Sequence, residues 1–344
     1  MELRELTRLA GVSGDEGAVR NYILEQTKPL ADEVKIDRMG NVLAFKRGTA
    51  ARPNHALLAA HMDEVGLIVL GFKDDGLIVY EPVGGIDARI MVSKRMRVGK
   101  DLIPGVIGCK AIHLQSPDER KQPLTHKQLF VDIGAKDREA AQKLVSLGDY
   151  ISFEPGYVEF GDGFVKDKAL DDRVGCYNLL RLLAGRYPCD VTFAFTVQEE
   201  VGLRGATVAA RQVKPDCALV LEATTANDLG KVDPHFRVCV PGRGAAISFM
   251  DNASIAHPAL NRRLRELADA RGIAWQVKAF VAGGNDAGAL QREAGAVPVC
   301  PVSIPCRNIH SPANVANAND IEAQYRLAEA FLNEGAAIES SKGR

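Results

Sequence analysis

The chain has 344 residues, of which 46% are apolar and 25% charged, and its formal net charge is −1. Such a composition is typical of a globular protein that is long enough for two domains or one large one. A net charge near zero, without a dense run of Lys and Arg, argues against binding to nucleic acid or to an acidic membrane surface. The charged N-terminus and the absence of a long apolar run predict neither a signal peptide nor a membrane span, so we expect a cytoplasmic protein.

Helical and extended patterns alternate over the first 60 residues. The spacing of apolar residues predicts a helix over 17–32 and strands over 34–38, 41–47 and 55–62. The sequence pattern then changes, because residues of roughly 66 to 160 consist of short apolar runs broken by turns, with one helical segment at 137–148. This pattern predicts a small β-rich domain, residues 67–158, inserted into a larger domain formed by 1–66 and 159–344.

From residue 174 onward, helices and strands alternate again. The predicted helices are 174–187, 203–213, 261–272, 285–295 and 320–335, and the predicted strands are 190–200, 216–223, 274–280 and 297–305. This alternation predicts an α/β fold whose sheet is covered by helices on both faces. The seven scattered cysteines include no Cys-x-x-Cys pair, so we expect buried structural thiols rather than disulfides or a zinc knuckle.

Polar residues with metal-binding chemistry lie at the ends of the predicted strands of this α/β part or just beyond them. They are His61 and Asp63 at the end of the third strand, Asp171 and Asp172 before a helix, Glu199 and Glu200, Glu222, and His310 after the last strand. Ligand sites of open α/β sheets lie at such strand ends, so these side chains are expected to converge. Taken singly, each has a structural explanation, for example a helix N-cap at Asp171 or Asp172. Together they favour two divalent cations, because buried carboxylates repel one another unless a cation lies between them.

The type of ligand narrows the choice of metal. A mixed nitrogen and oxygen set without thiolates suits zinc, cobalt or manganese better than calcium. The adjacent glutamates would then have different roles, since neighbouring side chains on an extended chain point in opposite directions.

Several motifs occur in a fixed order along almost the whole chain. They are GVSGDEGAVR, AAHMDEVGLIV, GVIGCKAIHL, VDIGAKDREAA, KALDDRVG, TVQEEVGLRGA, GGNDAGAL and IHSP. With these motifs the sequence resembles the tetrahedral (TET) aminopeptidases, the glutamyl-aminopeptidase-like family of dinuclear metallopeptidases, which also includes proteins labelled endoglucanase. The resemblance implies a zinc-peptidase-like mixed sheet with a barrel-like inserted dimerisation domain, and hydrolysis of short peptides with a free N-terminus.

The resemblance also implies a role for each candidate residue. His61 and Glu222 would bind one metal, Glu200 and His310 the other, and Asp171 would bridge both. Glu199 would be the general base that takes a proton from the water between the two metals and delivers it to the leaving amine. Asp63 would accept a hydrogen bond from the far nitrogen of His61 and fix its tautomer. Zinc is the expected metal, with cobalt or manganese as alternatives.

The sequence departs from the family pattern at two positions. Glu222 stands where many relatives carry Asp, and Asn285 stands where Thr is expected. Neither change removes a ligand type. The choice of Asp171 over Asp172 rests on the family pattern alone.

Other functions remain possible from the residues. A glycosidase would need two carboxylates but neither histidine, a peptide-binding scaffold would not need Glu199, and a small-amide deacylase would use the same residues. The side-chain preference at the substrate N-terminus, whether acidic, aliphatic or basic, does not follow from the motifs. The inserted domain has apolar stretches and no candidate site residue, so we expect it to bury surface against its own chain or against another copy, with a self-contained monomeric lid as the alternative. The family implies dimers that close into a hollow dodecamer.

Overall fold

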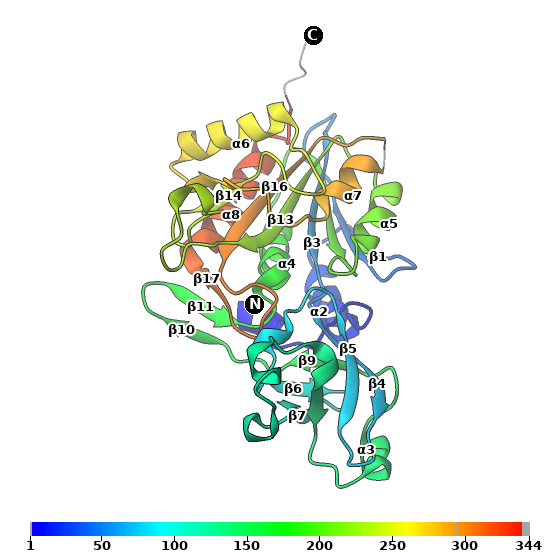
Figure 1. Ribbon diagram of the computed structural model, residues 1–344. Coiled ribbons are helices and arrows are strands. Elements are labelled where there is room, and N and C mark those ends of the chain that lie inside the picture. The colour runs from blue at the N-terminus through cyan, green and yellow to red at the C-terminus, as the bar shows by residue number, and fades with distance from the viewer. Residues whose placement is uncertain (1, 294, 339–344) are drawn as a thin grey trace.

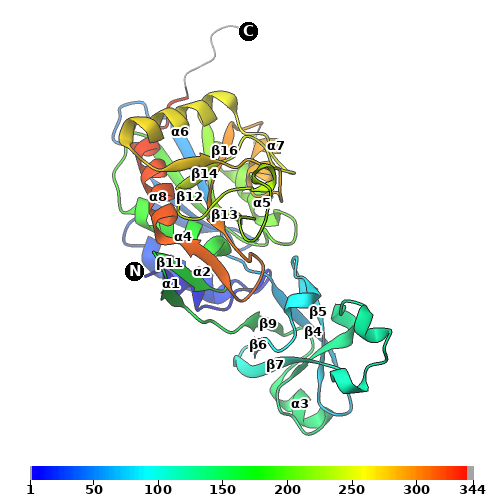
Figure 2. The same cartoon turned by 60° about the vertical axis from the view of Figure 1, so that its left-hand side comes forward.

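The computed structural model describes residues 2–293 and 295–338. It consists of an α/β part and a smaller barrel at the end of the molecule opposite α6 (Pro258–Arg271), as Figures 1 and 2 show. None of the described helices is both long enough and apolar enough to cross a membrane.

The α/β part is built on an eight-stranded mixed sheet. In spatial order its strands are β1 (Glu33–Ile36), β2 (Val42–Lys46), β12 (Asp190–Thr196), β3 (His55–His61), β13 (Cys217–Thr225), β16 (Val299–Cys306), β14 (Ala245–Ile247) and β15 (Trp275–Val277). The central strands β12, β3, β13 and β16 are parallel, whereas β2 and β14 run antiparallel to their neighbours in that group. The carboxyl ends of four central strands therefore meet at one edge.

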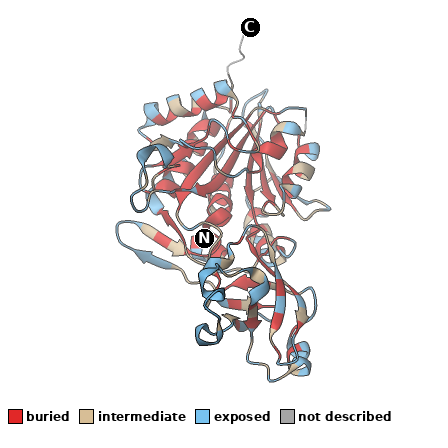
Figure 3. Ribbon diagram, in the orientation of Figure 1, coloured by how far each residue is buried: buried red, intermediate tan, exposed pale blue. Residues whose placement is uncertain are grey.

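Helices cover both faces of this sheet. They are α1 (Leu3–Thr7), α2 (Gly17–Thr27), α4 (Leu170–Leu183), α5 (Arg204–Gln212), α6, α7 (Ala287–Arg292) and α8 (Ala318–Asn333). Strand β3 shows why two layers form, because successive side chains point to opposite faces. Leu57 and Ala59 pack in the core that includes α5 and α7, and Leu58 packs in the core that includes α4, α6 and α8. Figure 3 accordingly shows buried residues along the strands of this sheet.

The barrel is closed and antiparallel. Its strands are β4 (Gly66–Phe72), β5 (Ile78–Val83), β8 (Leu129–Asp132), β7 (Ile103–Cys109), β6 (Arg95–Val98) and β9 (Tyr150–Phe153), with α3 (Arg138–Leu144) and the 3-10 turns η1 (Ala88–Ile90), η2 (Ile112–Leu114), η3 (Glu119–Lys121) and η4 (His126–Gln128). Alternate strand residues such as Leu67, Val69, Met96 and Ile151 fill its interior. The barrel thus has a hydrophobic core of its own.

A small third sheet follows the barrel in the chain. Strand β10 (Val158–Phe160) pairs with β11 (Phe164–Asp167), and β11 pairs with β17 (Asn314–Asn317), which leads directly into α8. One further 3-10 turn, η5 (Pro234–Phe236), lies in the connection from β13 to β14.

The predicted fold class is confirmed: a mixed α/β sheet covered on both faces, with an added β-barrel. The structure differs in detail, because the strand expected over 190–200 ends at Thr196 and the strand expected over 274–280 is only β15. Strands β14 and β17 were not predicted, since they are three and four residues long. All seven cysteines are free and six are buried, as expected for structural thiols.

Candidate active site

The predicted site residues gather at the carboxyl-terminal edge of the parallel strands. His61 ends β3, Glu199 and Glu200 follow β12, and Glu222 lies within β13. His310 follows β16 in the connection to β17, and Asp171 lies at the start of α4. Residues up to 249 positions apart in the sequence thus reach one place, because the parallel strands all end at this edge.

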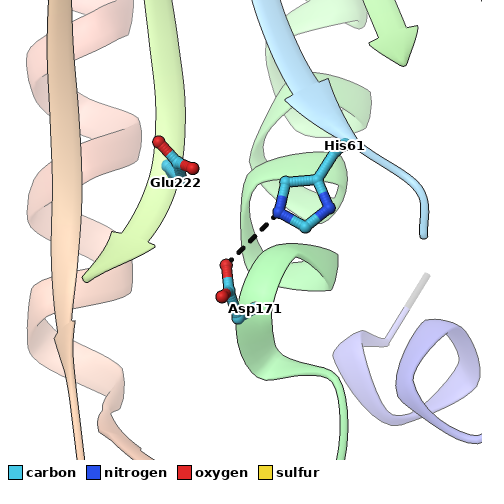
Figure 4. A group of neighbouring side chains, drawn as sticks. All are labelled: His61, Asp171 and Glu222. Atoms are coloured by element: carbon cyan, nitrogen blue, oxygen red, sulfur yellow. Dashed lines mark ion pairs between the residues drawn. The ribbon is translucent and has the colours of Figure 1, made fainter. Parts of the chain in front are cut away.

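Three of these residues form one group of possible metal ligands, His61, Asp171 and Glu222 (Figure 4). One ligand atom from each lies within 4.8 Å of the others, and all three residues are buried. The Nε2 atom of His61 lies 3.4 Å from Oδ1 of Asp171. The other ring nitrogen, Nδ1, donates a hydrogen bond to the main-chain oxygen of Asp63 at 3.1 Å. That bond leaves Nε2 free as a ligand.

A second group consists of Asp171, Glu200 and His310. The Nε2 atom of His310 lies 3.2 Å from Oε2 of Glu200 and 3.6 Å from Oδ2 of Asp171. Asp171 therefore belongs to both groups, with one oxygen toward each histidine. The Nδ1 atom of His310 donates to the main-chain oxygen of Gly85 at 2.9 Å. Gly85 lies in the inserted segment, which we had expected to contribute nothing to the site.

The neighbouring carboxyl group of Asp172 accepts hydrogen bonds from main-chain N–H groups. Its Oδ1 accepts from the Gly175 N–H at 3.0 Å, and its Oδ2 accepts from the His61 N–H at 3.2 Å. Asp172 therefore holds the start of α4 against the end of β3 and faces main-chain donors. This arrangement favours Asp171 as the ligand.

The adjacent glutamates lie in the loop after β12, beyond the end of the strand. Gln198, just before them, has a left-handed backbone with φ of 55°. The carboxylate of Asp63 accepts the N–H groups of Glu199 and Glu200 at 3.0 and 3.1 Å, and it also accepts the Ser13 hydroxyl at 2.6 Å. A fixed loop, rather than strand alternation, therefore sets the two glutamates apart. The Asp63 carboxylate is also 3.4 Å from Nδ1 of His61, so the expected hydrogen bond to the ring goes to its main-chain oxygen instead.

Burial perturbs every carboxylate of the site. Burial raises the pKa of Glu200 to about 7, with Asp171 adding to the rise and His310 opposing it. Burial together with Asp286 and Glu200 raises the pKa of Glu199 well above its usual value. The pKa of Glu222 is likewise raised well above its usual value by burial and by Glu199 and Asp171. Burial thus favours the protonated form of each of these groups, and a nearby cation would favour the ionised form instead.

The two histidines and Asp171 shift one another's pKa values. Burial lowers the pKa of His310, but Asp171 and Glu200 outweigh burial and raise it to about 9. The pKa of His61 is also held well above its usual value, because Asp171 and Asp63 outweigh burial. Burial opposes ionisation of Asp171, yet the two imidazoles hold its pKa below the usual range. Asp171 is thus the ionised group that lies between the two imidazoles.

The donor set fits divalent cations. Within the described residues, Oδ1 of Asp171 and Oε2 of Glu222 are buried and have no hydrogen-bond partner. Unpaired buried oxygens are strongly unfavourable unless they bind a ligand. Imidazole nitrogens and carboxylate oxygens without a thiolate suit zinc, cobalt and manganese.

The site opens into a cavity of about 330 Å³. The cavity is lined by Glu199, Glu200, Glu222 and His310, and also by Lys278 and residues 282–285. A larger cavity of about 470 Å³, near Tyr157 and Arg181, contains none of the candidate residues. Of these two cavities, the smaller one reaches the ionisable groups.

Two buried residues of this region were not predicted. Asp286 accepts the Thr196 hydroxyl at 2.5 Å and raises the pKa of Glu199, in addition to burial. Lys278 lies within the strand expected over residues 274–280, and no polar pattern in that segment marks it as a site residue.

Asn285, the unusual residue of the Gly-rich turn, donates to Asp251 at 3.1 Å and accepts the Ala287 N–H at 3.0 Å. Asn285 therefore stabilises the start of α7, and its side chain does not replace a ligand.

The chain is similar to known aminopeptidases. The family model described as M42 glutamyl aminopeptidase matches residues 40–327. A protein named putative aminopeptidase from Acetivibrio thermocellus is 36% identical over 327 residues, which are 94% of this chain and 96% of that protein.

Solved structures give the same relationship. The aminopeptidase APDkam598 from the archaeon Desulfurococcus kamchatkensis superimposes with a TM-score of 0.94 and 34% identity, covering 99% of this chain and 97% of that chain. The PhTET1 structure, described as a dodecamer, has a TM-score of 0.85 and 31% identity and covers 96% of this chain and 98% of that chain. The chain belongs to the M42 glutamyl aminopeptidase family of peptidases.

Proposed function

We propose that the protein is a dinuclear metal-dependent aminopeptidase that releases N-terminal residues from short peptides. One observation carries this proposal: two groups of possible ligands share Asp171 and open into the same cavity. Membership of an aminopeptidase family supports the reaction, and the shared carboxylate supports the presence of two ions rather than one.

The residues divide between the two ions. His61 and Glu222 would hold one ion, Glu200 and His310 the other, and Asp171 both. Divalent ions supply Lewis acidity, which makes water a stronger nucleophile and polarises the scissile carbonyl. Zinc is our first choice, with cobalt or manganese as alternatives, because all three accept this mixture of ligands.

Glu199 is suited to move the proton. Its carboxylate is buried beside the ligand groups, with Oε2 3.9 Å from Nε2 of His61, and it lines the cavity. It would take a proton from the attacking water and deliver it to the leaving amine.

Asp63 acts through its neighbours. Its carboxylate holds the main-chain N–H groups of both glutamates, and its main-chain oxygen holds the ring of His61. Asp63 therefore fixes the general base relative to one ligand of each ion. Loss of this carboxylate would release Glu199 and Glu200 together.

The inserted segment is proposed to form a dimerisation domain, residues 67–158. Exposed apolar side chains on the barrel, among them Leu102, Val106, Ile112 and Leu114, support a buried contact there. The PhTET1 dodecamer supports assembly of such dimers into a hollow particle that admits short peptides. The predicted cytoplasmic location fits an enzyme that trims such peptides.

Activity assays test the function. The metal-stripped protein should not hydrolyse aminoacyl p-nitroanilides, and zinc, cobalt or manganese should restore hydrolysis. An N-acetylated version of the best substrate should be resistant, because an aminopeptidase needs a free α-amino group. Full activity after removal of all metals would contradict the proposal.

A further inference from the structure

A further cavity meets the candidate site at His310. Its volume is about 390 Å³. It is lined by residues 308–313, from the connection between β16 and β17, and by four residues from the connection between β5 and β6, which are Gly85, Asp87, Ile90 and Lys94. Ile309 and His310 also line the cavity of about 330 Å³ that contains the other candidate ligands. We call that one the first cavity and the larger one the second cavity, and the two adjoin along these shared residues.

The groups in each cavity indicate which part of a peptide it would hold. The proposed general base Glu199 and the ligand groups of Asp171, Glu200 and Glu222 line the first cavity, so the scissile bond belongs there. Of the candidate site residues, the second cavity is lined by His310 alone. An aminopeptidase cuts after one residue, so the rest of its substrate extends away from the ligands. The second cavity is placed to receive that part.

The size of the second cavity limits how much of the substrate it holds. A volume of about 390 Å³ is at the small end of the range for small-molecule sites, so only a short stretch of chain fits. The end of a short peptide would therefore lie inside the cavity, whereas the end of a long peptide would lie outside it.

Lys94 provides an unpaired positive charge in the second cavity. The charged or titratable side chains of the lining are Asp87, Lys94 and His310, and His310 is a candidate metal ligand. Both carboxylate oxygens of Asp87 accept from Nε of Arg89, at 3.0 and 2.9 Å, so Asp87 has its own counter-charge. Lys94 is half-buried, and its ammonium group forms no ion pair or hydrogen bond within residues 2–293 and 295–338. Its three N–H donors are therefore available to an anionic ligand.

We propose that the second cavity binds the C-terminal end of a short peptide and that Lys94 binds the α-carboxylate of that end. This inference rests on the proposed aminopeptidase function. The α-carboxylate is an anion that a peptide with a free C-terminus carries whatever its sequence, and a lysine ammonium forms a charge-assisted hydrogen bond with it. Lys94 would thus favour short substrates over long ones without selecting their side chains.

Paired substrates isolate this carboxylate. Peptides of two to six residues share the N-terminal residue that the enzyme cleaves best, followed by alanines, and each is made as the free acid and as the C-terminal amide. The ratio of the kcat/KM values for acid and amide, from release of the N-terminal amino acid, reports recognition of the carboxylate. We expect wild type to favour the acid by roughly 10-fold at one length between two and four residues, the effect of one charged hydrogen bond. At six residues the ratio should be close to one.

Variants of Lys94 test which residue is responsible. Lys94→Met should bring the ratio close to one at every length, Lys94→Arg should retain the preference for the acid, and Lys94→Glu should favour the amide. The matched control is Lys100→Met, which removes an exposed lysine of the same barrel that does not line the cavity and should keep the wild-type ratios. Because each ratio is internally normalised, a partly unfolded preparation still reports it.

The outcomes distinguish this inference from the function on which it rests. Equal hydrolysis of acid and amide by wild type at every length would overturn the role of Lys94 and leave the aminopeptidase intact. So would a Lys94→Met variant that keeps the wild-type ratios but hydrolyses acids, amides and an aminoacyl p-nitroanilide more slowly by one common factor, because that pattern indicates a structural role. A metal-loaded wild type that hydrolyses neither the peptides nor the p-nitroanilide would overturn the proposed function itself.

Discussion

Replacing Glu64 with glutamine should strongly destabilise the protein. Glu64 is 2% exposed and its Oε1 accepts hydrogen bonds from Lys168 at 2.7 Å, Arg173 at 3.4 Å and the Gly11 N–H at 3.1 Å. The side chains of Lys168 and Arg173 are also buried, at 1% and 0% exposed. Glu64 is therefore the carboxylate that pairs with two buried cations.

The expected loss follows from that arrangement. An amide of the same shape keeps an acceptor oxygen but removes the negative charge, so both cations stay buried without it. Breaking a buried ion pair in this way costs about 3–5 kcal/mol of the free energy of unfolding. A loss near the lower limit lowers the unfolding midpoint by roughly 6–12 °C at about 2–4 °C per kcal/mol.

Calorimetry of wild type and Glu64→Gln at equal metal loading measures this shift. The matched control is Glu322→Gln, because Glu322 pairs with Arg181 at 2.7 Å but is 48% exposed. Loss of that pair should cost less than about 1 kcal/mol. Equal midpoints for Glu64→Gln and Glu322→Gln would refute the reasoning that burial gives the Glu64 pair its importance.

The other predictions concern the site and the assembly. Glu199→Gln should keep both metals and lose at least ~10²-fold in kcat, whereas Glu200→Gln should also lose metal, and elemental analysis showing the reverse would exchange their roles. Apparent zinc affinity should rise from pH 6 to pH 8. The raised pKa values of Glu200 (about 7) and His310 (about 9) leave these groups protonated at the lower pH, and zinc binding must displace those protons. Calorimetry in buffers of different ionisation enthalpy measures the released protons, and finding none would contradict this prediction. Light scattering should give a mass far above the 37.1 kDa of one chain. Deletion of residues 67–158 should give smaller species, and their activity should be reduced because the deletion removes the Gly85 oxygen that holds His310. A fully active monomer would contradict the proposed assembly.

Much of the fold follows from local patterns. The apolar run of β3 and the 3.6-residue period of α8 are long enough to identify their elements, and the alternation of such elements identifies the layers. Strand β14 could not be predicted, because its three residues acquire their conformation from pairing with β15 and β16. Short strands of this kind depend on tertiary contacts.

The candidate site shows the same division. His61, Glu222 and the other polar residues at strand ends stand out because each interrupts or follows an apolar strand. The choice between Asp171 and Asp172 could not be made locally, since only the folded chain shows Asp172 paired with main-chain donors. The burial of Lys278 could not be predicted either, because a lysine in an amphipathic segment is normally exposed. Its burial results from packing against residues that are distant in the sequence.

The number of metal ions bound by each variant tests the central claim most directly. Metal-stripped protein is titrated with zinc, and bound metal is counted per chain for wild type, Glu222→Gln and Asp171→Asn. Because Asp171 belongs to both ligand groups and Glu222 to one, we predict two ions in wild type, about one in Glu222→Gln and fewer than one in Asp171→Asn. Saturation of the wild type by a single ion, or two tightly bound ions in Asp171→Asn, would contradict a shared dinuclear site.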